Sequence, residues 1–160
     1  MTIDPKILEL ADNYKSATLE FYNFVKGISA DVLDKKKSGA SAEDWSPRQV
    51  IHHMMDSEST SFLRLRRLIA EPGSIIQGYD EMAWANNPFL GYKQLGIENS
   101  LAVYISVREA SYQQLLRINP EHLKNSCNHS ESGPFTLEKW LSAYSKHPLD
   151  HLGQIKEALA

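Results

Sequence analysis

The sequence predicts an all-α protein, a four-helix bundle with a long crossover between its second and third helices. Four segments of about 20 residues each carry apolar side chains at helical spacing. Residues typical of helix N-termini stand before several of them, and no segment alternates as a half-buried strand would. At 160 residues the chain, 1–160, is expected to form a single domain with a proper core.

The first helix is expected over residues 5–28. Apolar residues recur at helical spacing, and Asp4 followed by Pro5 is typical of an N-cap and the first helical position. A polar loop is expected over residues 35–44, where a short run of lysines forms a solvated turn.

The second helix has the clearest start in the chain. Ser46 is the expected N-cap, Pro47 the first helical residue, and Gln49 the partner that completes a capping box. Trp45 precedes the cap and is placed to pack on the first turns of the helix. The helix is expected to end before Pro72.

The rest of the chain contains a long connection and two further helices. Residues 71–95 form the connection, with a short helical turn at 80–84. A crossover of this length lets the third helix, 97–118, run parallel to the second. A loop over 125–135 is expected to precede the fourth helix, which begins after its N-cap Thr136 and runs to about residue 158.

Composition excludes several classes of function. The net charge is −3, and the sequence has no basic stripe with interleaved aromatics, so nucleic acid is not an expected partner. No apolar run is long enough to cross a bilayer. A single cysteine and an N-terminus without signal-peptide features lead us to expect a cytoplasmic protein.

Histidines supply the clearest chemical signal. His147 and His151 stand four residues apart on the last expected helix, so their rings share one face. Imidazole suits divalent transition metals, and a catalytic site commonly has three protein ligands and an open position. A third ligand would come from His52 or His53 on the second helix, and spacing alone does not choose between them.

Pro148 lies between the paired histidines, inside the last expected helix. A proline there cannot bond the carbonyl of Tyr144 and costs about 3 kcal/mol in an ordinary helix. Such a departure from local rules is expected at functional sites, although a kink that serves packing explains it equally well.

Several separated motifs resemble one family. The segments 45–53, 79–85, 129–133, 144–147 and 151–152 resemble, in the same order, the motifs of the DinB superfamily, and most closely its YfiT-like branch. That branch includes bacillithiol S-transferases and proteins described as metal-dependent hydrolases. The resemblance implies a four-helix bundle with up-down-down-up topology, and it is compatible with a homodimer.

The resemblance also implies a divalent metal, Ni²⁺ or Zn²⁺, held by three histidines. Alignment on the tryptophan assigns the second-helix ligand to His53, and the C-terminal pair becomes His147 and His151. This sequence departs from the branch at Asp150 and Gln154, where histidines are common. Pro148 departs as well, because it stands where small residues are usual, and the pocket and its substrate are therefore open.

Other residues are candidates for binding a substrate. His129 lies in the matching segment and is, with Arg108 or Arg48, a candidate for binding an anionic thiol cofactor. His129 would equally serve to shape its loop, and the arginines to solvate a helix face. Tyr79, Trp84 and Tyr144 would line an apolar pocket or belong to the core. The expected substrate is a small molecule.

A metal held by neutral imidazoles acidifies a bound thiol or water. Thiol activation would make a low-molecular-weight thiol S-transferase, whereas a metal-bound hydroxide would make a hydrolase. Asp56, Glu58, Asp80, Glu81 and Asp150 are carboxylates near the expected site, but none belongs to a motif that fixes a general base. The sequence therefore favours thiol transfer over hydrolysis. The third alternative is a non-catalytic metal-binding bundle. The sequence assigns no catalytic residue.

Overall fold

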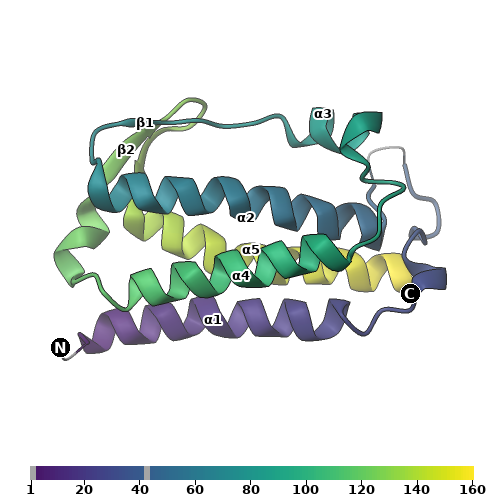
Figure 1. Ribbon diagram of the computed structural model, residues 1–160, viewed down its shortest axis with the longest axis horizontal. Coiled ribbons are helices and arrows are strands. Elements are labelled where there is room, and N and C mark those ends of the chain that lie inside the picture. Colours follow the sequence, from purple (N-terminus) through teal and green to yellow (C-terminus); the bar gives the residue numbers. More distant parts are fainter. Residues whose placement is uncertain (1–2, 42–43) are drawn as a thin grey trace.

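The computed structural model describes residues 3–41 and 44–160. Four long helices in these residues lie side by side, and α1 and α5 run in one direction while α2 and α4 run in the other (Figure 1). This arrangement confirms the up-down-down-up bundle. The helices are α1 (Pro5–Val25), α2 (Pro47–Ala70), α4 (Glu98–Leu115) and α5 (Leu137–Leu159).

Local capping explains where the first helix begins. The side chain of Asp4 accepts hydrogen bonds from the backbone N–H groups of Lys6 and Ile7, so the predicted N-cap is confirmed. The helix ends at Val25, three residues earlier than predicted, and a short 3₁₀ helix, η1 (Ala30–Val32), follows. Residues 1–2 and, in the expected loop, 42–43 lie outside the described residues.

The two helices that carry the histidines also begin at the predicted residues. Ser46 and Gln49 form the reciprocal capping box of α2, in which each side chain accepts a bond from the other residue's backbone N–H. Thr136 caps α5 by accepting a bond from the N–H of Lys139. These caps fix the register of both helices and hence the faces on which the histidines stand.

The connection between α2 and α4 passes over the outside of the bundle (Figure 1). It contains the two-residue strand β1 (Ile75–Ile76), the short helix α3 (Glu81–Asn86) and the 3₁₀ helix η2 (Pro88–Leu90). The predicted helical turn is confirmed as α3, which Asp80 caps by accepting a bond from the N–H of Ala83.

The segment expected to be a loop over residues 125–135 instead contains two short strands. Strand β1 pairs in parallel with β2 (Ser126–His129), and β2 pairs antiparallel with β3 (Gly133–Thr136). Strands of two to four residues are too short to show alternation, and the φ of +70° at Gly133 lets the β2–β3 hairpin close over three residues. The third long helix also ended early, at Leu115, and is followed by η3 (Pro120–Lys124).

The core contains a buried ion pair as well as apolar side chains. Arg108 of α4 and Glu58 of α2 are 1% and 0% exposed, and their side chains are 2.9 Å apart. Two apolar clusters fill the rest of the bundle, one toward each end. Among residues 3–41 and 44–160, no helix has both the length and the apolar character needed to cross a membrane.

Candidate metal centre

Three histidines from two helices meet inside the bundle. His53 of α2 is buried, whereas His147 and His151 of α5 are partly buried. The Nε2 atom of His147 lies 3.4 Å from Nε2 of His53 and 3.0 Å from Nε2 of His151. One nitrogen from each ring falls within 4.8 Å of the others, which is the spacing that ligands around a single ion require.

His52 takes no part in this cluster. Its Nδ1 lies 2.8 Å from the hydroxyl of Ser100 on α4, and its Nε2 lies 3.3 Å from the carbonyl of Leu95. His52 therefore ties α2 to α4, while the next residue, His53, turns about 100° around the helix toward α5. The two adjacent rings therefore face different helices, and of the two only His53 lies in the cluster.

Burial keeps the three rings neutral. It is the largest cause that lowers the pKa of His53 to about 3 and that of His147 to about 2, and the neighbouring histidines lower both further. Burial also lowers the pKa of His151, against a hydrogen bond to Gln154 that raises it. Neutral imidazoles offer the unprotonated nitrogens that a metal needs, so the residues present fit a divalent ion.

The outer nitrogens of the rings have different surroundings. His151 Nδ1 lies 2.8 Å from Oε1 of Gln154, an acceptor that places the ring proton on Nδ1 and leaves Nε2 free to coordinate. His53 Nδ1 lies 3.5 Å from the hydroxyl of Tyr79. Within the described part of the chain, the buried Nδ1 of His147 has no hydrogen-bond partner.

Trp45 forms part of the wall of the cluster, a role that the sequence did not reveal. Its ring lies parallel to that of His151, with an interplanar angle of 10° and centroids 6.4 Å apart, and its centroid is 4.8 Å from that of His53. The residue was predicted only to pack at the start of α2. Its place before the N-cap is the signal that fixes it beside the first turns of that helix.

One carboxylate stands beside the histidines. Oε2 of Glu81, in the first turn of α3, lies 3.5 Å from Nε2 of His53. Partial burial raises the pKa of Glu81, and the charges of Asp80 and Glu131 raise it further. A carboxylate with a raised pKa next to a candidate metal centre is suited to accept a proton from a nucleophile.

The other carboxylates considered from the sequence have other partners. Asp56 accepts a bond from the hydroxyl of Tyr92, Glu58 pairs with Arg108, and Asp150 forms an exposed ion pair with Lys146. Asp80 caps α3. The four side chains therefore have structural roles in the bundle or on its surface.

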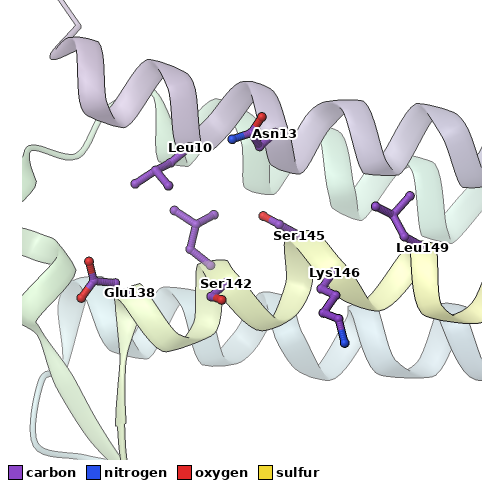
Figure 2. A pocket seen from close by; sticks show the side chains of 8 residues that line it. Leu10, Asn13, Glu138, Ser142, Ser145, Lys146 and Leu149 are labelled. Atoms are coloured by element: carbon purple, nitrogen blue, oxygen red, sulfur yellow. The ribbon is translucent and has the colours of Figure 1, made fainter.

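A cleft of about 330 Å³ lies beside the cluster and includes two of its three histidines. It is lined by His53, Ser57, Arg64, Tyr79, Glu81, His129, Glu131, Ser132 and His147. A groove of about 370 Å³ between α1 and α5 shares none of these residues (Figure 2). Figure 2 shows Leu10 and Asn13 on α1, on one side of that groove, and Ser145 and Leu149 on α5, on the other.

His129 reaches the cleft and also holds its own loop. Its Nδ1 accepts bonds from the backbone N–H groups of Glu131 and Ser132, at 3.2 and 3.4 Å. Partial burial and the nearby Arg64 lower the pKa of His129, so the neutral ring carries its proton on Nε2. The two roles considered for this residue, shaping the loop and lining the pocket, are therefore compatible.

The bundle and the histidine cluster together describe a helical protein with a candidate metal centre, and comparison with known proteins places it in a family. The sequence profile of the DinB superfamily matches residues 14–155. The chain belongs to the DinB superfamily.

Several relatives carry a functional description. A protein of Oceanobacillus iheyensis named "putative metal-dependent hydrolase" is 33% identical over 134 residues, which is 83% of this chain and 74% of the relative. A protein of Bacillus mycoides with the same description is 31% identical over 111 residues, which is 69% of this chain and 62% of that relative. This chain therefore spans less than two thirds of the Bacillus mycoides protein.

A solved structure shares the fold. YfiT from Bacillus subtilis, described as a "probable metal-dependent hydrolase with an unusual four-helix bundle topology", superposes with a TM-score of 0.83. The superposition covers 98% of this chain and 88% of YfiT at 24% sequence identity. At this level of identity the likeness establishes the fold, including the parallel arrangement of α2 and α4.

Proposed function

We propose that this protein is a divalent-metal-dependent enzyme in which His53, His147 and His151 bind the ion. The observation that carries the proposal is the convergence of three neutral Nε2 atoms, two of them 3.0 Å apart. Unprotonated nitrogens at this distance repel each other unless a cation or a shared proton lies between them. Imidazole ligands suit both Ni²⁺ and Zn²⁺, and cellular supply decides which ion fills such a site.

When bound, a divalent ion with three neutral ligands would lower the pKa of a thiol or water molecule in its open position toward neutrality. Glu81 is the residue placed to accept the proton that is released, since its carboxylate stands beside His53. Gln154 holds the ring of His151, and Trp45 excludes water from one side of the cluster. The open cleft admits a small-molecule substrate.

The first candidate reaction is the transfer of a low-molecular-weight thiol to an electrophile. Uncharged ligands leave the full charge of the ion to stabilise a thiolate. Arg64 and the Nε2–H of His129 belong to the wall of the same cleft, where they would attract the acidic groups of a thiol cofactor. This reaction also agrees with the preference drawn from the sequence.

The second candidate reaction is hydrolysis, which Glu81 specifically favours. A metal hydrolase commonly uses a carboxylate near the attacking water, and the sequence offered no motif to supply one. Glu81, on the crossover, stands 3.5 Å from Nε2 of His53 and would supply such a carboxylate. The names of the Oceanobacillus and Bacillus relatives support this alternative.

The proposal is tested first by metal content. Purified protein should carry, or take up, close to one equivalent of Ni²⁺ or Zn²⁺, and both His53→Ala and His151→Ala should lose it. Loaded protein is then assayed for conjugation of small thiols with monobromobimane and for hydrolysis of p-nitrophenyl esters. Folded wild-type protein that binds neither ion would overturn the proposal, and the two assays decide between the candidate reactions.

A further inference from the structure

The helix that carries two of the three histidines contains a proline between them. Helix α5 continues through Pro148 without interruption, although proline has no N–H with which to bond the carbonyl of Tyr144. That carbonyl lies in the protein core, where an unpaired oxygen is costly. The structure supplies another donor, because Nη1 of Arg108 lies 2.8 Å from the oxygen of Tyr144.

Arg108 joins all four long helices through its guanidinium group. It extends from α4, is 1% exposed, and contacts the carbonyl of Tyr144 on α5. It donates to Thr18 Oγ1 at 2.7 Å and to the carbonyl of Tyr14 at 2.9 Å, both on α1. Its Nη1 also donates to Glu58 of α2 at 2.9 Å. These contacts hold the guanidinium in one position relative to α5.

His147 depends on its backbone more than the other two histidines do. Metal-binding histidines usually fix their second ring nitrogen with a hydrogen bond, as His151 does with Gln154. Among the described residues, the buried Nδ1 of His147 has no such partner. Its ring is therefore oriented by packing and by the helical turn from Tyr144 to Pro148, in which a side chain from α4 replaces a backbone donor.

We propose that Arg108 is a positioning residue for the metal centre. By bonding the carbonyl that Pro148 leaves without a helical donor, it fixes the turn of α5 that carries His147 and the start of the turn that carries His151. A buried ion pair is weak evidence for a stabilising role, and the contact with α5 gives this pair a geometric one. This inference rests on the proposed three-histidine metal site.

The test uses Co²⁺ as the probe, because its visible absorption reports ligand geometry as well as binding. Arg108→Met is combined with Glu58→Met so that no carboxylate is left buried alone. We expect Co²⁺ affinity to fall about 10- to 100-fold and the absorption bands to shift, as for loss of a group that orients a ligand. Tyr104→Phe, one helical turn away on α4 and also buried, is the control and should bind Co²⁺ like the wild type.

Pro148→Ala provides a second test, in which the only change to the core is the loss of part of one buried side chain. The new N–H can bond the carbonyl of Tyr144, so adding this change to the Arg108/Glu58 variant should restore part of the lost affinity. In the otherwise wild-type protein Pro148→Ala should also shift the Co²⁺ absorption, because the carbonyl of Tyr144 then accepts a helical bond beside the one from Arg108 and the turn that carries His147 moves toward regular helical geometry.

The outcomes separate this inference from the proposed function. A folded Arg108→Met/Glu58→Met variant with wild-type Co²⁺ affinity and absorption would overturn the positioning role while leaving the metal site intact. If the double variant does not fold, the Pro148→Ala protein replaces it in the test, and an unchanged Co²⁺ spectrum in Pro148→Ala would overturn the positioning role of Arg108. Wild-type protein that fails to bind Co²⁺, Ni²⁺ or Zn²⁺ would overturn the metal site itself.

Discussion

Oε2 of Glu81 lies 3.5 Å from Nε2 of His53, although the two residues belong to different parts of the fold. His53 stands on α2 inside the bundle, and Glu81 stands on the crossover that passes outside it. The crossover is anchored by its strand β1, which pairs in parallel with β2 and lies just before α3 along the chain. The crossover that lets α2 and α4 run parallel therefore also brings a carboxylate to the histidines.

Glu81→Gln should reduce kcat about 10²- to 10⁴-fold with little change in metal content, because the amide keeps the shape of the side chain but cannot accept a proton. In the wild type the rate should rise with pH through the raised pKa of Glu81, since only the ionised form is a base. The variant should lose that rise. Rate–pH profiles and metal analysis of the same samples measure both effects.

Glu131→Gln is the matched control for this prediction. Glu131 lines the same cleft and carries the same charge, but His53 has its close carboxylate contact with Glu81. A loss of kcat as large in Glu131→Gln as in Glu81→Gln would show that the charge of the cleft matters and that Glu81 has no particular role.

Adjacent histidines on α2 should behave oppositely when replaced. His53→Ala should abolish tight metal binding, whereas His52→Ala should retain it and lose about 1–3 kcal/mol of folding stability. The reason is that His52 bonds Ser100 and the carbonyl of Leu95 and takes no part in the cluster. Calorimetric titration with Zn²⁺ and urea unfolding of both variants check this. Loss of metal from His52→Ala at unchanged stability would contradict the assignment.

The starts of the histidine-bearing helices and the shared face of His147 and His151 could be predicted from the sequence, because both depend on local rules. Caps at Ser46 and Thr136 and the spacing of His147 and His151 are properties of single helices. Distinguishing His53 from His52 by periodicity failed because apolar residues surround much of α2, so the answer depended on which helix each ring faced.

What the sequence did not reveal depends on contacts between distant segments. Glu81 and Trp45 meet the histidines only through the tertiary packing of a crossover and a loop. Arg108 and Tyr144 are 36 residues apart in the sequence. The sequence showed only that Pro148 removes the helical donor for the Tyr144 carbonyl, and gave no sign that Arg108 supplies another. The short strands escaped notice because two to four residues are too few to show a period.

The metal-free protein should become less stable as the pH falls below about 6.5. His53 and His147 have their pKa values lowered to about 3 and about 2 in the folded state, so between these values and 6.5 the unfolded chain binds more protons than the folded chain. Folding stability then declines by up to about 1.4 kcal/mol per pH unit for each histidine. Urea unfolding between pH 7.5 and 5 measures this slope.

His53→Gln is the comparison for the pH experiment, because it removes one of the titrating groups. Its slope should be smaller than that of the wild type by one histidine's share. Bound Zn²⁺ should stabilise the protein most at neutral pH and progressively less as protons compete for the ligands. A wild-type slope equal to that of His53→Gln would contradict burial of a neutral imidazole at this position.

Gln154 should control metal affinity without touching the ion. Its Oε1 accepts the Nδ1 proton of His151 at 2.8 Å, which keeps Nε2 unprotonated and aimed at His147. Gln154→Leu removes that acceptor and should weaken Zn²⁺ binding about 10- to 100-fold, whereas Gln154→Glu keeps an acceptor and should bind at least as tightly as the wild type. Competition titrations with a chelating dye measure the affinities. Equal affinities for the Leu and Glu variants would show that packing alone orients His151.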